Sequence, residues 1–170
     1  MTFTAAPPID TERLELRGHR AADFDECFAM WSDPVVTRYI GNKPSTRTEV
    51  WARLIRYVGH WTVLGFGFWV IRERSTGRFV GEAGFFDMKR GIGPTYDNSP
   101  EIGWILAPTS HGKGYATEAV QRIVAWGDQH LASSRSVCMI EDGNLASVRV
   151  AEKSGYREFM RGSIEGDPVT

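Results

Sequence analysis

Hydrophobic residues follow helix-like and strand-like spacings along the first half of the chain. A short strand is predicted over 13–17, followed by a helix over 23–31 whose apolar face is Phe24, Cys27, Phe28 and Trp31. Pro34 is expected to end this helix. Thr46 and Glu49 have the spacing of a capping box and predict a second helix through residue 57. β-Branched and aromatic residues then predict a hairpin over 67–73 and 79–86.

The second half alternates strands and helices. A loop rich in Gly, Asp and Pro over 87–100 precedes a strand that begins at Glu101. The next helix has one apolar stripe, formed by Ala116, Ala119, Val120, Ile123, Val124 and Leu131. A short strand over 137–140, a helix from about residue 144 and a strand over 155–161 complete the chain. This order predicts an α/β (α+β) fold in which helices cover both faces of a mixed sheet, within one domain over residues 1–170.

A glycine-bracketed turn lies between the Glu101 strand and the following helix. Gly112 and Gly114 leave the backbone amides of residues 113–116 accessible at a helix N-terminus, which is a favourable position for phosphate oxygens. A dinucleotide fingerprint does not fit, because Thr117 stands where the third glycine belongs, and a Walker loop does not fit, because Lys113 is followed by glycine. The turn by itself is compatible with a phosphorylated cofactor and with simple turn punctuation, and the motifs around it favour the cofactor.

Composition excludes several other classes of protein. The 170 residues are 42% hydrophobic and contain 20 basic and 21 acidic residues, so no basic excess points to nucleic acid. The N-terminus lacks the pattern of a signal peptide, and the apolar stretch over 63–71 is too short to span a membrane, so a cytoplasmic location is expected. The two cysteines and four histidines show no metal-ligand spacing, and no metal is predicted.

Several segments in order resemble one known family. HGKGYATEA over 111–119 and NLASVRVAEKSGY over 144–156, preceded by TERLELR over 11–17 and GEAGF over 81–85, resemble the GNAT acetyltransferases of the RimJ/RimL type over nearly the whole chain. The resemblance implies a mostly antiparallel, twisted sheet of about six to seven strands, in which two parallel strands splay apart around acetyl-CoA. It implies cofactor contacts from the backbone of Trp104, Ile105 and Leu106, from the turn residues His111, Gly112, Lys113, Gly114, Tyr115, Ala116 and Thr117, and from Asn144.

The chemistry of acetyl transfer suggests candidate catalytic residues. An amine that attacks a thioester must lose a proton, and Glu101 is the first candidate to accept it, with Glu82 on the neighbouring strand as the reserve. The departing thiolate needs a donor. The tyrosine that many GNAT enzymes use is replaced here by Ala151, so the resemblance assigns sulfur contacts to Asn144 and Ser147. Asn144 also suits a purely structural helix cap.

The basicity of the amine suggests which acceptor is used. An α-amine, with a pKa of about 7.7 to 8.0, needs less help than a lysine amine near 10.4, which favours a protein N-terminus. Small amines such as antibiotics, polyamines or amino-acid derivatives are the alternative, and a non-catalytic acyl-CoA sensor is a third. Tyr39 and Glu82 are the predicted substrate contacts. The sequence leaves the oligomeric state open, including a dimer. The family's usual final strand is not evident after Pro168, so a sheet edge is expected to stay unpaired or to be covered by a partner.

Overall fold

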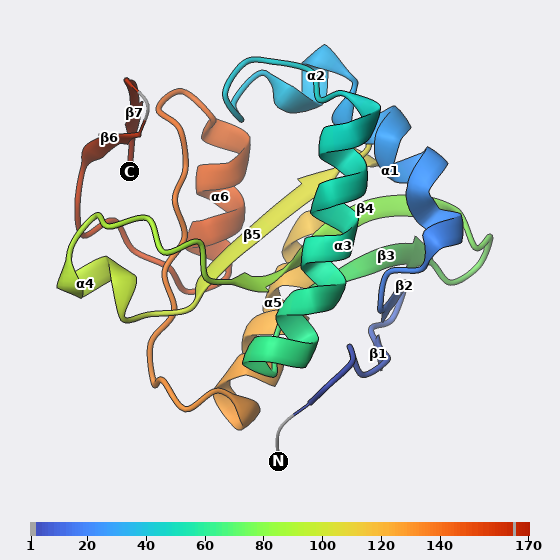
Figure 1. Ribbon diagram of the computed structural model, residues 1–170, viewed down its shortest axis with the longest axis horizontal. Coiled ribbons are helices and arrows are strands. Elements are labelled where there is room, and N and C mark those ends of the chain that lie inside the picture. Colours follow the sequence, from blue (N-terminus) through green and yellow to red (C-terminus); the bar gives the residue numbers. More distant parts are fainter. Residues whose placement is uncertain (1–2, 165) are drawn as a thin grey trace.

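The computed structural model describes residues 3–164 and 166–170, and its centre is a five-stranded antiparallel sheet (Figure 1). The strands lie side by side in chain order: β1 (Ile9–Asp10), β2 (Leu14–Arg17), β3 (Phe68–Glu73), β4 (Phe79–Phe86) and β5 (Glu101–Leu106). A separate two-stranded sheet near the C-terminus consists of β6 (Gly162–Ile164) and β7 (Asp167–Val169).

Helices cover both faces of the main sheet. The helices are α1 (Phe24–Trp31), α2 (Pro34–Thr37), α3 (Arg47–Leu64), α4 (Pro94–Asp97), α5 (Tyr115–His130) and α6 (Leu145–Lys153). α1 and α3 pack together over one face, α5 packs on the opposite face, and α6 lies beside the edge of β5 (Figure 1). Short 3-10 turns occupy Ala21–Asp23 and Pro108–Ser110. No helix in the described ranges is both long and apolar enough to cross a bilayer.

The predicted mixed α/β fold is confirmed, but its strands are divided between two sheets. Five strands form the main sheet and two form the C-terminal one, instead of a single sheet of six or seven. The predicted parallel neighbour of β5 is reduced to one parallel bridge between Glu101 and Val137. Beyond that bridge the outer edge of β5 has no strand partner in the described part of the chain.

The strand predicted over 137–140 does not form, because its backbone bonds run in two directions. The N–H of Ile102 donates to the carbonyl of Val137 at 2.8 Å, whereas Ile140 exchanges hydrogen bonds of 2.8 and 2.9 Å with Thr170. The segment therefore passes from the main sheet to the C-terminal one within four residues. The strand predicted over 155–161 is also absent, and β6 and β7 form further along. These two strands pair with each other and add no strand to the main sheet.

Helix boundaries differ from the sequence prediction for local reasons. Pro34 begins α2 instead of only ending α1, because Asp33 accepts a hydrogen bond from the N–H of Val35 at 2.8 Å and proline suits a first helical position. The capping box at Thr46 is present, but α3 continues to Leu64, where Gly65 ends it with a φ of 77°. The predicted loop over 87–100 also contains the short helix α4.

The main core joins the sheet to the helices on both faces. Trp69 of β3 packs edge-on against Trp61 of α3 and Trp126 of α5, with ring centroids 4.6 and 5.2 Å apart. A second apolar cluster includes Cys27, Met30 and Trp31 of α1, packed on β3 and β4. Both clusters fix the positions of α1, α3 and β4, which border the cavities described below.

Candidate active site

Two adjoining cavities lie along the edge of β5. The α5 cleft is the cavity between β5, the turn over 110–114, the start of α5 and α6, with a volume of about 660 Å³. Three cationic side chains line it, Arg38, Arg149 and Lys153, and no carboxylate does so among the residues that the structure describes. This set of side chains suits a polyanionic ligand such as a phosphorylated cofactor.

The outer edge of β5 offers main-chain groups beside the α5 cleft. The N–H of Ile102 points away from β4, since it donates to Val137. Strand alternation places the N–H and C=O of Trp104 on the same outer edge. Further along this edge, the C=O of Leu106 accepts a hydrogen bond from Nε2 of His111 at 2.9 Å. These main-chain groups are therefore open to an extended ligand, and the predicted pairing of the cofactor with Trp104 stays a prediction.

The turn before α5 presents backbone amides to the same cleft. Gly112 and Gly114 have φ values of 73° and 79°, in the left-handed region that favours glycine. Gly114 is the N-cap of α5, so the first N–H groups of the helix, beginning with Tyr115 and Ala116, lack acceptors within the helix. The positive end of the helix dipole adds to the attraction for an anion. The geometry therefore fits a pyrophosphate group.

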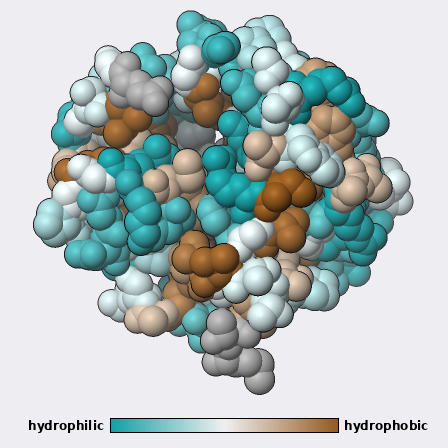
Figure 2. All heavy atoms as spheres, viewed as in Figure 1, coloured by the Kyte–Doolittle hydropathy of each residue, from teal (hydrophilic) through white to brown (hydrophobic). Residues whose placement is uncertain are grey.

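The second cavity, the α3 cavity, lies between α3, β5 and the C-terminal hairpin and has a volume of about 400 Å³. Figure 2 shows this face of the molecule, which is hollowed between α3 and α6. The two cavities share six lining residues: Tyr39, Ile40, Trp104, Ile105, Asn144 and Ser147. Ligands bound in the two cavities would therefore meet at these residues. A further cavity of about 820 Å³ behind α6 contacts neither β5 nor the turn before α5.

Glu101 lies at the start of β5 and lines the α3 cavity, although only 5% of its surface is exposed. Arg90 holds its carboxylate with two hydrogen bonds, at 2.9 Å from Nε and 3.2 Å from Nη2. Burial by itself would lower the pKa of Arg90, but the hydrogen bond and charge of Glu101 outweigh burial and raise it. Burial and the charge of Glu101 also raise the pKa of Tyr96. The predicted catalytic base therefore belongs to an ion pair, which the sequence did not show.

Asn144 and Ser147 lie at the start of α6 and border both cavities. Oδ1 of Asn144 accepts a hydrogen bond from the backbone N–H of Ser147 at 3.2 Å, so the structural capping role is present. Within residues 3–164 and 166–170, the side-chain NH₂ of Asn144 and the hydroxyl of Ser147 donate to no other residue. Both donors are thus available to a ligand where the cavities meet. Tyr39 borders both cavities as well.

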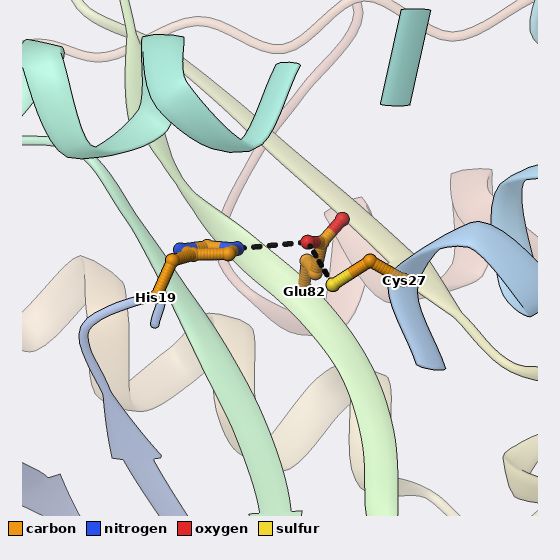
Figure 3. Close-up of side chains that lie close together, drawn as sticks. All are labelled: His19, Cys27 and Glu82. Carbon is orange, nitrogen blue, oxygen red and sulfur yellow. Dashed lines mark hydrogen bonds and ion pairs between the residues drawn. The ribbon is translucent and has the colours of Figure 1, made fainter. Parts of the chain in front are cut away.

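Glu82 occupies a different position from the one predicted. It is 1% exposed and lines neither cavity, so the expected direct contact with substrate is not supported. Its Oε1 lies 2.8 Å from Nε2 of His19 and accepts a hydrogen bond from Sγ of Cys27 at 3.1 Å (Figure 3). Its Oε2 accepts a hydrogen bond from Nε1 of Trp31 at 2.8 Å. Burial raises the pKa of Glu82, but these hydrogen bonds and the charge of His19 outweigh burial and lower it.

The same cluster brings together three types of metal ligand that the sequence spacing did not connect. One ligand atom from each of His19, Cys27 and Glu82 lies within 4.8 Å of the others. Burial, followed by the charge of Glu82, raises the pKa of Cys27, so its sulfur stays a thiol. The carboxylate is satisfied by protein donors in this arrangement, and the side chains of all three residues are buried. The cluster thus acts as a packed polar network beneath Trp31.

Two residues of the α3 cavity were missed by the sequence analysis. Glu141 lines the cavity, and burial together with the nearby charge of Asp167 raises its pKa. Arg53 of α3 also lines it, with its guanidinium carbon 3.6 Å from the ring centroid of Trp31. Helical periodicity placed Arg53 on the same helix as Val50 and Leu54, but it carried no signal that this side chain would face a cavity.

Comparison with known proteins identifies the family. A model of the acetyltransferase (GNAT) domain matches residues 13–157. An uncharacterized protein of Bacillus subtilis, YkkB, is 30% identical over 170 residues, covering 94% of this chain and 91% of that protein. A solved structure described as a GnaT-family acetyltransferase from Bordetella pertussis superimposes with a TM-score of 0.84 at 34% identity, covering 96% of both chains. The chain therefore belongs to the GNAT acetyltransferases and is an acyltransferase by family.

More distant structures share the fold but differ in the amine they acetylate. RimL, an α-N-protein acetyltransferase of ribosomal L7/L12 solved with coenzyme A, has a TM-score of 0.77 at 15% identity and 96% coverage of this chain. A spermidine N-acetyltransferase from Vibrio cholerae, solved with CoA and spermine, has a TM-score of 0.72 at 18% identity and 94% coverage. The resemblance to the RimJ/RimL branch in particular therefore stays a prediction.

Proposed function

We propose that this protein transfers the acetyl group of acetyl-CoA directly to the α-amine at the N-terminus of a protein or peptide. The observation that carries the proposal is the meeting of the two cavities at Asn144, Ser147 and Trp104. The α5 cleft suits the phosphates and the extended arm of the cofactor, and the α3 cavity leaves room for an acceptor. An amine in one cavity and a thioester in the other would come together at these residues.

The α5 cleft would hold the cofactor through main-chain and cationic groups. The amides of residues 112–117 and the dipole of α5 would bind the pyrophosphate, and Arg149 and Lys153 add positive charge at the same cleft. Trp104 would pair with the amide groups of the pantetheine arm through its N–H and C=O. When bound, acetyl-CoA supplies a thioester carbonyl for the amine to attack and a thiolate as leaving group.

Residues of the α3 cavity, two of them shared with the α5 cleft, would move the protons. The amine must lose a proton as the new C–N bond forms, and Glu101 would receive it through a water, since Glu101 is ion-paired and largely buried. The hydroxyl of Ser147 and the side-chain NH₂ of Asn144 would donate to the departing sulfur. Glu141 is the competing proton acceptor, because it lines the same cavity with a raised pKa.

The α3 cavity favours an N-terminal amine over a polyamine. Its described lining carries three carboxylates, Glu101, Glu141 and Asp167, against three arginines, Arg53, Arg56 and Arg90. Because Arg90 already neutralises Glu101, the cavity has no acidic excess to attract a polycation. An α-amine that is partly neutral near pH 7 requires no such excess.

Release of free CoA thiol from acetyl-CoA tests the proposal, using N-terminal peptides, polyamines, aminoglycosides and amino acids as acceptors. Turnover with peptides should fall by about 10²- to 10⁴-fold in Glu101→Gln if Glu101 is the base, whereas Glu141→Gln should keep most of the activity. A larger loss of activity in Glu141→Gln than in Glu101→Gln would identify Glu141 as the proton acceptor. Stabilisation by acetyl-CoA without turnover on any amine would instead support an acyl-CoA sensor, and absence of stabilisation would refute the cofactor assignment.

A further inference from the structure

Arg53 combines partial burial with the lack of an acidic partner. Its guanidinium is half-buried on α3, stacks on the ring of Trp31 and donates one long hydrogen bond of 3.3 Å from Nη1 to Oγ of Ser45. Within residues 3–164 and 166–170, no carboxylate lies within ion-pair distance of it. Burial is the largest influence on its pKa, which is lowered. Most buried cations are paired, whereas the desolvation cost of Arg53 is offset only in part, by the charges of Glu82 and Glu49 beyond ion-pair distance.

The buried network around Glu82 holds Arg53 in place. Glu82 accepts the indole N–H of Trp31 at 2.8 Å, and His19 and Cys27 fix the other carboxylate oxygen. Trp31 is therefore locked with one face of its ring toward Arg53. A stacked guanidinium loses little further freedom when it binds an anion, because its orientation is already set.

A second guanidinium, that of Arg56, extends the positive charge along the side of the α3 cavity formed by α3; Arg53 and Arg56 together are called the arginine wall. Arg56 follows Arg53 by three residues, which places both on one side of α3, and both line the α3 cavity. Arg56 likewise has no carboxylate partner among the described residues. The carboxylates of the cavity lie elsewhere, with Glu101 near the start of β5 and Glu141 and Asp167 near the C-terminal hairpin.

The register of the sheet separates Glu82 from Glu101 along β4 and β5. Glu82, which anchors the arginine wall through Trp31, is opposite Ile105, whereas Glu101 is opposite Phe86. Four residues of strand separate the two levels, about 13 Å at roughly 3.3 Å per residue. Ser147 lines the same cavity as Glu101 and Arg53. Because Ser147, Arg53 and Arg56 all line this cavity, an acceptor with its amine near Ser147 can present a second group to the two arginines.

We propose that Arg53, assisted by Arg56, binds a carboxylate of the acceptor, so that the preferred substrate is an N-terminus with an acidic side chain at its first or second residue. This inference rests on the proposed N-terminal acetyltransferase activity and names its substrate class. A polyamine would instead place positive charge against both arginines.

Matched peptides test the inference. With Ser-Glu, Ser-Gln and Ser-Lys N-termini of otherwise identical sequence, kcat/KM is expected to be highest for Glu and lowest for Lys. Loss of one charge-assisted contact corresponds to about a tenfold or larger effect. Arg53→Gln should remove most of the preference of Glu over Gln through KM, while Arg122→Gln on α5, far from the cavity, should preserve it. Arg53→Lys keeps the positive charge but not the planar, stacked guanidinium, so it should lose part of the preference of Glu over Gln. This variant also serves as a control in case Arg53→Gln misfolds.

Binding of the acetylated products gives a readout that needs no turnover. Calorimetry should show tighter binding of acetyl-Ser-Glu than of acetyl-Ser-Gln peptides to the wild type and equal binding to Arg53→Gln. Equal affinity of both products for the wild type would overturn the anion site, even if peptides are acetylated. Turnover of free acidic amino acids alone, still dependent on Arg53, would support the anion site but contradict the N-terminal acceptor.

Discussion

Removal of the Glu82 carboxylate tests whether the buried network beneath Trp31 stabilises the fold. Glu82→Ala would leave three donors, on His19, Trp31 and Cys27, facing a cavity where the carboxylate was. Each buried donor left without an acceptor costs about 1–3 kcal/mol, but the three costs are not additive. Because removing one partner of a buried charged pair typically costs about 3–5 kcal/mol, we expect a loss in that range in the free energy of unfolding.

Glu82→Gln separates charge from shape. The amide has one acceptor oxygen, and if it faces Trp31 its NH₂ group faces His19 and Cys27. His19 could accept from that NH₂ group at Nε2 only with its proton on Nδ1, which is buried without a partner among the described residues. A cost of about 1.5–3 kcal/mol is expected, the value of hydrogen bonds to a charged group.

Urea unfolding followed by circular dichroism measures both changes. Glu15→Ala, which removes an exposed carboxylate from β2, is the matched control and should change stability by no more than about 0.5 kcal/mol. The pKa of Glu82 is lowered in the folded state, so its contribution is present above the unfolded pKa of about 4.3 and is lost as pH falls below it. The difference in the free energy of unfolding between the wild type and Glu82→Gln should therefore become smaller from pH 7 to pH 4. A cost below about 1 kcal/mol for Glu82→Ala would refute the reasoning.

Three further predictions concern the helix cap, the sheet and the turn. Thr46→Ala removes the acceptor for the N–H of Glu49 and should cost about 1 kcal/mol in unfolding free energy, whereas the exposed neighbour Thr48→Ala should cost little; equal effects would contradict the cap. Gly84→Ala would place a Cβ 2.2 Å from the carbonyl oxygen of Gly67 and should destabilise the protein by about 2–3 kcal/mol. Gly59→Ala, which has open space around it in α3, should instead stabilise the protein by up to about 1 kcal/mol. A higher melting temperature for Gly84→Ala than for Gly59→Ala would argue against this packing. His111→Ala removes the hydrogen bond to Leu106 and should raise the Kd for acetyl-CoA about 3- to 10-fold by calorimetry, and an unchanged Kd would exclude this role.

Features encoded by near neighbours were predictable from the sequence. The capping box at Thr46 and Glu49, the hairpin of β3 and β4, and the glycine turn before α5 each depend on residues a few positions apart, and each is present. Asn144 was given two roles, and the structure shows its cap while leaving its NH₂ group free at the cavity.

Features that depend on distant partners were not predictable. The 137–140 segment has the composition of a strand, but its pairing depends on Thr170, 30 residues away from Ile140. Glu82 alternates correctly for a strand, yet His19 and Trp31, 63 and 51 residues away, determine that it is enclosed. The unpaired state of Arg53 depends on which acidic residues tertiary packing brings near, and a single sequence contains no pattern for that.

The division of the two cavities between different segments has a consequence for protein engineering. Apart from the six shared residues, the α5 cleft is built mainly from residues 106–117 and 146–153, whereas the α3 cavity is built mainly from α3, residues 86–103, residues 139–141 and the C-terminal hairpin. Mutagenesis libraries can therefore vary Arg53, Arg56, Ile164, Asp167 and Val169 without altering the backbone amides of the turn before α5. Directed evolution can therefore change the residues of the α3 cavity to obtain new acceptor preferences, while the residues of the α5 cleft stay constant.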